Sequence, residues 1–251
     1  MLDHLAVVNG DGRRFLAMQV PAISAQEVSK RQVPAISAHE VSKSFGDRTV
    51  LRGASIEVPF GEGAVLQGPN GVGKTTLLRI LATVITPDSG SATVGGFDVR
   101  RQAARVRHQI GVAFVNERSI YWRLNAWENL KLFAATRGVG EDQREAQIRG
   151  IADELDVTPF LTRRIADLST GQRQRIILAR AGLGDPKVLL IDEPLRGLDE
   201  DGVERTMAFL KARADAGAAV LIVSPTIKEL AGRNLSLFRL RDGMIRPDEW
   251  E

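Results

Sequence analysis

The stretch that decides the fold is GPNGVGKTT, residues 68–76. An apolar run, GAVLQ (63–67), precedes it, and a helical pattern, TLLRILATVI (76–85), follows it. The glycines let backbone N–H groups turn inward around phosphate oxygens, and the N-terminus of the following helix directs its partial positive charge at the same oxygens. The stretch therefore predicts a phosphate cradle between a buried strand and a helix.

The spacing of Gly68, Gly73, Lys74 and Thr75 fits the P-loop pattern. We expect Lys74 to reach the β- and γ-phosphates of a nucleotide and Thr75 to offer its hydroxyl to Mg²⁺. The expected cofactors are thus ATP and Mg²⁺. The residues predicted to bind the nucleotide through this loop are Gly68, Pro69, Asn70, Gly71, Val72, Gly73, Lys74, Thr75 and Thr76.

A second apolar run, KVLLIDEP (187–194), reads as a buried strand that delivers Asp192 and Glu193 at its carboxyl end. Ligands of open parallel sheets bind beyond that end, and two acids there are costly without a cation to neutralise them. Asp192 suits the surroundings of Mg²⁺, and Glu193 suits the base that activates water for hydrolysis. The alternative is that both acids only cap the next turn.

Strands and helices alternate from about residue 55 onward, which predicts an α/β fold: a P-loop NTPase core with a mainly parallel sheet. The run AAVLIVSP (218–225) supplies a further buried strand, and SFGDRTVLRGASIEV (44–58) alternates like an antiparallel hairpin, the start of an antiparallel β-subdomain. Residues 101–164 interrupt the alternation and are expected to form a helical subdomain insertion.

Within this insertion, AWENLKLFAATRG (126–138) and EAQIRGIADELDV (145–157) are predicted helices. The segment RGVGEDQRE (137–145) between them is predicted as a loop.

The composition is that of an ordinary globular chain of 251 residues with a net charge of +3. There is no cysteine, which excludes disulfides and thiolate metal sites. No apolar run reaches the roughly 18 residues of a membrane span. The near balance of charge favours a mixed surface, and no nucleic-acid partner is expected.

A tandem copy occupies the N-terminal region, because MQVPAISAQEVSK (18–30) is followed by RQVPAISAHEVSK (31–43). The second copy runs into the predicted hairpin, so we expect residues 1–31 to be an extension and residues 32–251 to be the folded domain. Either the first copy is a mobile extension, or both copies compete for one strand position.

Between the P-loop and the acidic strand lies LSTGQRQR (168–175), which resembles the signature of the ATP-binding-cassette (ABC) family. The resemblance covers residues 37–251, with a core of 32–100 and 165–251 around a helical subdomain of about 101–164. It implies that two cassettes pack head to tail, as a homodimer or a heterodimer, around two ATP molecules. Each ATP then lies between the P-loop of one cassette and the signature of the other.

The signature residues expected to reach the ATP of the partner cassette are Ser169, Thr170, Gly171 and Gln172. Ser169 is equally suited to cap its helix, and both roles are compatible. Thr170 stands where the family usually has glycine. Since a β-branched residue disfavours positive φ, either this position has ordinary dihedrals or the cradle is altered.

Other residues carry over from the resemblance one at a time. Phe45 matches the aromatic residue that stacks on adenine, with a core position as the alternative. In EPLRGLDE (193–200), Gly197, Leu198 and Asp199 match the dimer loop, although Leu195 and Arg196 are bulkier than usual. Asn116 stands where a glutamine near Mg²⁺ is usual, so its contact through a bridging water is expected.

The aromatic residues Tyr121, Trp122 and Trp127 follow closely after Asn116. The resemblance implies that this segment couples nucleotide to transport, and the aromatic cluster is predicted to receive a permease helix. Simple core packing is the alternative.

The run VLIVSPT (220–226) aligns with the strand whose end brings a histidine to the γ-phosphate in this family. The matching residue is Pro225, which has neither a side-chain donor nor a backbone N–H. This strand end would still supply a donor if a turn at the proline directed the Ser224 or Thr226 side chain toward the γ-phosphate. Since one lost donor typically costs about 10²–10³ in rate, we expect slow turnover or completion of the site by a partner.

The sequence thus predicts an ATP-hydrolysing subunit of an ABC transporter that drives a separate integral-membrane permease. It is expected at the cytoplasmic, inner face of the cell membrane, and the LSTG (168–171) pattern favours an exporter of the ABC-2 type. Two alternatives stay open: a soluble ABC ATPase without a transport role, and an ATP-binding regulatory cassette with degraded catalysis.

Overall fold

The computed structural model describes residues 7–8, 14–15, 33–114 and 120–250. The chain divides into two units, residues 1–32 and residues 33–251. In the first unit, β1 (Val7–Val8) pairs with β2 (Arg14–Phe15) in an antiparallel manner. The first copy of the duplication, residues 18–30, lies outside the described residues, and so does Asn116.

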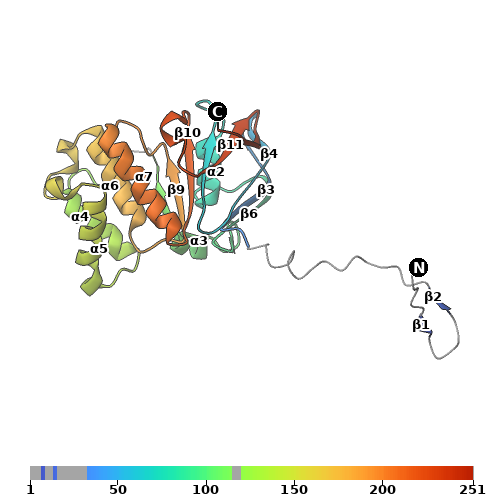
Figure 1. Cartoon of the computed structure of the whole chain (residues 1–251), viewed down its shortest axis with the longest axis horizontal. Coiled ribbons are helices and arrows are strands. Elements are labelled where there is room, and N and C mark those ends of the chain that lie inside the picture. Colours follow the sequence, from blue (N-terminus) through green and yellow to red (C-terminus); the bar gives the residue numbers. More distant parts are fainter. Residues whose placement is uncertain (1–6, 9–13, 16–32, 115–119, 251) are drawn as a thin grey trace, which may run out of the picture. The chain divides into compact units, whose positions relative to one another are not determined.

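The second unit contains a six-stranded sheet in the order β12-β11-β5-β10-β9-β8. Figure 1 labels β9, β10 and β11 of this sheet. Five strands run parallel, and β12 is antiparallel to β11 at one edge. The central strands are continuous apolar runs because both of their faces are covered. The strands are β5 (Gly63–Gln67), β8 (Ile110–Ala113), β9 (Val188–Asp192), β10 (Ala219–Ser224), β11 (Ser236–Arg241) and β12 (Met244–Asp248).

A four-stranded antiparallel sheet, ordered β4-β3-β6-β7, completes the β-structure. The expected hairpin is present: β3 (Ile36–Phe45) pairs with β4 (Arg48–Val58), and Gly46, at φ 56°, begins the two-residue turn. The short strands β6 (Ser89–Val94) and β7 (Phe97–Asp98) pair next to β3. The second copy of the duplication therefore runs into β3.

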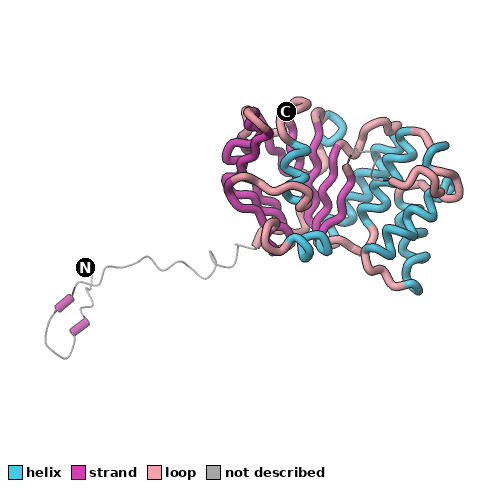
Figure 2. Tube along the Cα trace, turned by 180° about the vertical axis from the view of Figure 1, so that it is seen from behind, coloured by secondary structure: helices cyan, strands magenta, loops and turns pink. Residues whose placement is uncertain are grey.

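Nine further segments of the described chain are helical, namely six α-helices and three short 3₁₀ helices, among them η2 (Thr158–Phe160) and η3 (Ile165–Asp167). Figure 2 shows the longer helices gathered on the side of the six-stranded sheet away from the antiparallel strands. The α-helices are α2 (Lys74–Leu81), α3 (Ala103–Gln109), α4 (Ala126–Thr136), α5 (Glu141–Glu154), α6 (Thr170–Gly182) and α7 (Glu200–Asp215). A short 3₁₀ turn, η4 (Lys228–Leu230), follows β10.

Two boundaries in the predicted insertion differ from the structure. Residues 101–164 are not wholly helical, because β8 forms the edge strand of the parallel sheet beside β9. The predicted loop at 137–145 is shorter than expected, because α5 already begins at Glu141. Glu141 and Asp142 stabilise this helix start, since negative side chains interact favourably with the N-terminal partial charge.

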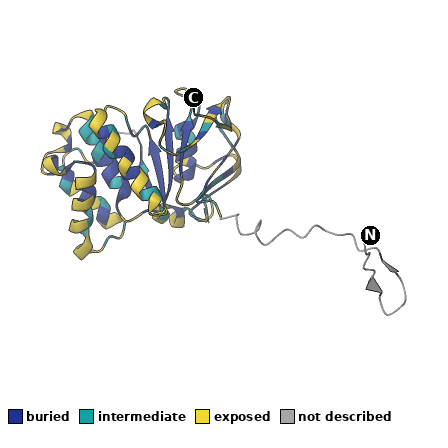
Figure 3. Ribbon diagram, viewed as in Figure 1, coloured by how far each residue is buried: buried dark blue, intermediate teal, exposed yellow. Residues whose placement is uncertain are grey.

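The core consists of two apolar clusters on opposite faces of the six-stranded sheet, buried along the central strands in Figure 3. Successive residues of a strand point to opposite faces. Leu189 and Ile191 of β9 accordingly pack toward α4–α7, whereas Val188 and Leu190 pack toward α2 and the antiparallel sheet. This alternation fixes the register of β9 and thereby the position of Asp192 at its end.

The α/β fold with a mainly parallel sheet, an antiparallel sheet and added helices is confirmed. Within the described ranges, no helix combines the length and apolar character that a bilayer crossing requires. Because β5, β9 and β10 run parallel, their carboxyl ends meet at one edge of the sheet. The P-loop, the acidic pair and Pro225 all leave from that edge.

Candidate active site

The glycine loop between β5 and α2 requires glycine for identifiable reasons. A Cβ at Gly68 would lie 2.6 Å from the carbonyl oxygen of Leu240 on the neighbouring strand β11. Gly73 has φ 121°, and a Cβ there would lie 2.8 Å from Val50 Cγ1. The backbone of the loop thus packs directly on two neighbouring strands, as a narrow phosphate cradle requires.

Lys74 is buried at the first turn of α2. Its Nζ donates hydrogen bonds to the carbonyl oxygens of Gly68, at 2.6 Å, and Pro69, at 3.0 Å, so the ammonium lies within the loop that is predicted to hold phosphates. Burial lowers the pKa of Lys74, while the carboxylates of Glu193 and Asp192 raise it. A phosphate group beside this ammonium would stabilise its positive charge and so compensate for the water that burial removes.

Thr75 and Asp192 link the P-loop helix to the acidic strand. Thr75 Oγ1 donates a hydrogen bond to Asp192 Oδ2 at 3.0 Å, across 117 residues of sequence. Burial raises the pKa of the Asp192 carboxyl; the Thr75 hydrogen bond opposes that change, and the charge of Glu193 adds to it. A buried carboxylate in this situation gains from a neighbouring cation.

These two oxygens suit Mg²⁺, which prefers hard oxygen ligands and keeps most of its other positions for phosphates and water. Within the ranges that the structure describes, no group of three His, Cys, Asp or Glu side chains is placed to hold a metal without such help. The chemistry of the donor set therefore fits a metal that arrives with a nucleotide.

Glu193 follows Asp192 with a strained backbone, since its φ of 44° is unfavourable for a residue with a side chain. Two contacts maintain this conformation: Glu193 N donates to Val223 O at 2.9 Å, and Gln174 Nε2 donates to Glu193 O at 3.4 Å. Strain of this kind concentrates at functional sites, where surrounding contacts hold it. Glu193 lines a pocket at this end of the sheet.

That pocket has a volume of about 470 Å³ and lies beside the P-loop. Asn70 of the loop lines one wall, and Glu193 with Arg196 lines another. The complete lining is Asn70, Glu193, Leu195, Arg196, Leu198, Val203, Ser224, Pro225, Thr226 and Glu229.

The end of β10 turns sharply at Pro225. Thr226 N donates to Ser224 Oγ at 3.3 Å, and Ser224, Pro225 and Thr226 all line the pocket. Strict strand alternation would place Ser224 and Pro225 on opposite faces of the sheet. Because both residues line the same pocket, the structure supports a turn at the proline. The Ser224 hydroxyl already accepts this backbone hydrogen bond.

The signature segment forms the start of α6. Ser169 caps this helix in a capping box: its Oγ accepts from Gln172 N at 3.1 Å, and Gln172 Oε1 accepts from Ser169 N at 3.0 Å. Thr170 lies in the first helical turn without positive φ, so the expectation of ordinary dihedrals is correct. The nucleotide contacts of these residues stay predictions.

The signature packs against the dimer loop within this one chain. A Cβ at Gly171 would lie 2.5 Å from the carbonyl oxygen of Gly197, which itself has φ 74°. Leu198 contributes to the same contact, and Asp199 caps α7 by accepting from Gly202 N at 2.9 Å. The two predicted interface segments therefore form one continuous surface.

The predicted aromatic residues divide into exposed and half-buried positions. Phe45 is 51% exposed at the end of β3, with Lys43 Nζ 5.5 Å from its ring centroid, so the core alternative is wrong for this residue. Tyr121 is also exposed. Trp122 and Trp127 pack partly against the core, beneath the guanidinium groups of Arg173 and Arg149 respectively.

Sequence reasoning missed two residues that shape this site. Arg48 Nη2 donates to the carbonyl oxygen of Gly71 at 3.0 Å and so ties the P-loop to the hairpin. Gln174 supports Glu193 from α6. Nothing in the sequence around Arg48 predicts its contact with the P-loop. Gln174 could have been found, because glutamine is rarely buried and this one lies on the buried face of its helix.

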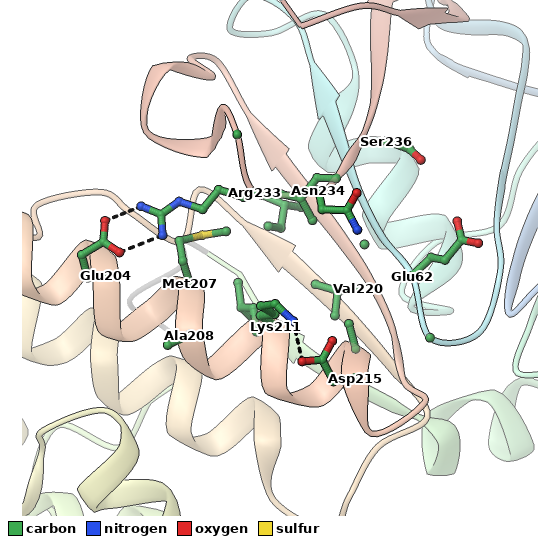
Figure 4. A pocket seen from close by; sticks show the side chains of 17 residues that line it. Glu62, Glu204, Met207, Ala208, Lys211, Asp215, Val220, Arg233, Asn234 and Ser236 are labelled. Atoms are coloured by element: carbon green, nitrogen blue, oxygen red, sulfur yellow. Dashed lines mark hydrogen bonds and ion pairs between the residues drawn. The ribbon is translucent and has the colours of Figure 1, made fainter.

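A larger pocket of about 750 Å³ lies at the amino ends of β5, β10 and β11, against α7 (Figure 4). Two ion pairs border it, Arg233 with Glu204 and Lys211 with Asp215. Ligands of open parallel sheets bind at the carboxyl ends of the strands, so this pocket is separate from the P-loop site despite its size.

Comparisons with known proteins agree with this geometry. The family model described as ABC transporter matches residues 51–196. The ABC transporter ATP-binding protein NatA of Bacillus subtilis is 32% identical over 195 residues, which cover 78% of this chain and 79% of that protein. The daunorubicin resistance ATP-binding protein DrrA3 of Streptomyces coeruleorubidus is 32% identical over 187 residues, covering 74% of this chain and 59% of that protein.

Among solved structures, a dimeric ATP-binding cassette in a post-hydrolysis state with ADP and Pi is similar in fold. Its TM-score is 0.78 at 24% identity, and the match covers 86% of this chain and 99% of that one.

Proposed function

The chain belongs to the family of ABC transporter ATP-binding proteins, and from this premise we propose that it hydrolyses ATP between two cassettes to drive a separate membrane permease. The observation that carries the proposal is the hydrogen bond of 3.0 Å between Thr75 and Asp192. It joins the P-loop helix to β9, the strand that ends at Asp192 directly before Glu193. A phosphate cradle, a place for a cation and a base then share one edge of the sheet.

The roles of the residues follow from their positions. Lys74 binds the β- and γ-phosphates of ATP, and Thr75 with Asp192 holds Mg²⁺. When bound, Mg²⁺ neutralises charge on the phosphate oxygens and fixes their orientation. Glu193 accepts a proton from the water that attacks the γ-phosphorus, a role typically worth about 10²–10⁴ in rate. The proposed contact of Asn116 through water belongs to the same set.

A second cassette completes the site in this proposal. Ser169 and the N–H groups of Gly171 and Gln172 contact the γ-phosphate of the partner's ATP, because they open α6 and are exposed or half-exposed. The dimer loop, Gly197–Asp199, lies against the same surface. Phe45, exposed at the end of β3, stacks on the adenine.

The permease is the second proposed partner. The proposed docking surface is the aromatic cluster of Tyr121, Trp122 and Trp127. Tyr121 and Trp122 precede α4, and Trp127 lies in its first turn. Closure of two cassettes on ATP would move this surface and the permease with it. We propose export as the direction, which the similarity to DrrA3, a daunorubicin resistance protein, supports. We propose the inner face of the cell membrane as the location.

Nucleotide-dependent dimerisation tests this proposal. Glu193→Gln slows hydrolysis without removing ATP binding, so ATP with Mg²⁺ should convert this variant from the mass of one chain to that of two in size-exclusion chromatography with light scattering. ADP should not. Lys74→Ala in the Glu193→Gln background is the control, and it should stay monomeric because it lacks the phosphate contact. A Glu193→Gln chain that binds ATP and remains monomeric would contradict the sandwich.

One observation favours a second candidate function, a nucleotide-gated regulatory cassette. The end of β10 presents Pro225, which cannot donate a hydrogen bond to the γ-phosphate. Tight ATP binding without any turnover, measured beside a co-expressed permease, would favour this candidate over the ATPase.

A further inference from the structure

Arg196 stands out in the pocket at the ends of β9 and β10. Among the described residues that line this pocket, it is the one cation, and the carboxylates of Glu193 and Glu229 belong to the same lining. Arg196 Nη1 lies 4.0 Å from Glu193 Oε2, with 63% of the Arg196 side chain and 27% of the Glu193 side chain exposed. The guanidinium is therefore beside the proposed base and free to change its partner.

The backbone brings Arg196 to this place through a tight turn. Arg196 N donates to the carbonyl oxygen of Glu193 at 3.3 Å, so residues 193–196 fold back on themselves. The same carbonyl oxygen accepts from Gln174, which fixes the turn to α6. Gly197, at φ 74°, then redirects the chain into the dimer loop. The position of Arg196 is thus set by the strained conformation of Glu193.

The neighbouring strand end lacks a positive group at the corresponding position. Pro225 has no N–H, and the Ser224 hydroxyl accepts the N–H of Thr226. Lys74 belongs to the P-loop, where its ammonium donates to the carbonyl oxygens of Gly68 and Pro69. Among the described residues of this pocket, Arg196 is the cation that would meet charge developing on a γ-phosphate between the P-loop and Glu193, once its side chain turns away from the Glu193 carboxylate.

We propose that Arg196 is a catalytic residue that binds the γ-phosphate in place of the donor that Pro225 cannot supply. The proposal rests on the proposed ATP hydrolysis. Water attacks the γ-phosphorus and gives its proton to Glu193, while the bond from the γ-phosphorus to the β–γ bridging oxygen breaks and ADP leaves with that electron pair. Arg196 remains protonated throughout, and its planar fork matches two phosphate oxygens.

The test compares Arg196→Ala with a matched control, Arg205→Ala. Arg205 also forms a local ion pair, with Asp201 on the surface of α7, but it does not line the pocket. Arg196→Ala should lower kcat for ATP by about 10²–10³, the usual effect of one lost transition-state donor. Arg205→Ala should stay within about twofold of the unmodified chain, because exposed ion pairs contribute little.

A readout without turnover separates this proposal from the proposed function. Arg196→Ala should reduce the preference for ATP over ADP by about tenfold, the usual weight of one charged hydrogen bond, with ADP affinity unchanged. Equilibrium titration with fluorescent nucleotides measures both affinities. If the unmodified chain binds ATP but never hydrolyses it, the proposed function fails, and this ratio still decides whether Arg196 contacts the γ-phosphate.

Two rescue experiments exclude a merely structural role. Low millimolar guanidinium should restore turnover of Arg196→Ala at least in part, whereas methylammonium should not. Pro225→His should raise turnover at least about tenfold in the Arg196→Ala background but only about threefold in the unmodified chain, because both groups serve one phosphate. Unchanged turnover and ATP preference in Arg196→Ala would overturn the proposal, and so would losses that neither rescue restores.

Discussion

The adjacent strands β9 and β10 are both fully buried, run parallel and end at the same edge of the sheet, yet their ends differ. The end of β9 presents two acids, and contacts from Val223, Thr75 and Gln174 fix them. The end of β10 presents a hydroxyl and a proline, held within their own turn by one hydrogen bond. Similar strands thus deliver a fixed acidic end and an end that is bare of charged side chains.

Burial and register therefore determine where each strand ends. Contacts from residues outside the strand determine whether the side chains at that end are held in place. Glu193 depends on α6, on β10 and on the P-loop helix for its surroundings, so its position is over-determined. Among the described residues, no comparable set of contacts fixes the position of Pro225. The chemistry that we propose for this edge therefore lies on the β9 side.

The largest effect on stability is expected where α6 packs beside the β9 end. In Gly171→Ala, the new Cβ meets the backbone oxygen of Gly197 at 2.5 Å, which should lower the free energy of unfolding by about 1–3 kcal/mol. Gly150→Ala is the control: its Cβ points into open space in α5, so it should gain about 0.5–1 kcal/mol. Urea unfolding measures both, and equal effects in the two variants would refute the packing argument.

A smaller effect is expected at Asp192, where burial raises the pKa of the carboxyl. Such a group binds its proton more tightly in the folded chain, so stability falls as pH rises from the ordinary value of 3.8 to the raised pKa. Asp192→Asn removes this loss. Without nucleotide, the variant should melt at a higher temperature than the unmodified chain at pH 7.

The pH dependence supplies the control for Asp192. At pH 4 the melting temperatures of Asp192→Asn and the unmodified chain should lie closer together, because the raised pKa favours protonation of the carboxyl in the folded state as the pH falls. A difference that is the same at both pH values, or that is larger at pH 4, would show that ionisation of Asp192 is not its source.

The smallest effect is expected at the end of β10. Ser224→Ala removes one long hydrogen bond and should cost less than about 1 kcal/mol, with ATP turnover within about threefold of the unmodified chain. Steady-state kinetics and thermal melting check both values. A loss of a hundredfold in turnover would mean that Ser224 donates to the reaction and that the end of β10 is not bare.

The sequence was sufficient for the parts of the fold that depend on local pattern. The glycine loop, the buried runs of β9 and β10 and the hairpin of β3 with β4 follow from spacing, apolar continuity and alternation. The acidic pair was placed correctly because parallel strands share one carboxyl edge. The start of α5 was missed, because a polar first turn after Gly140 resembles a loop until the helix is seen.

Long-range contacts were beyond the sequence. Nothing in the four residues of β8 distinguishes an edge strand from part of a helical insertion, since its pairing with β9 decides the matter. The support of the P-loop by Arg48 and of Glu193 by Gln174 joins residues far apart in the chain. The ion pair of Arg196 with Glu193 is local in sequence. Its proposed role nevertheless depends on the pocket, which the residues at the end of β10 also line.

The measurement that tests the central claim most directly is steady-state ATP turnover of the full chain at saturating MgATP, with Glu193→Gln as the background. Glu229→Gln is the matched control, since Glu229 lines the same pocket from the β10 side. We predict turnover well above the Glu193→Gln background, by about 10²–10⁴, and little change in Glu229→Gln. Turnover equal to the Glu193→Gln background while ATP is bound would contradict hydrolysis at the end of β9.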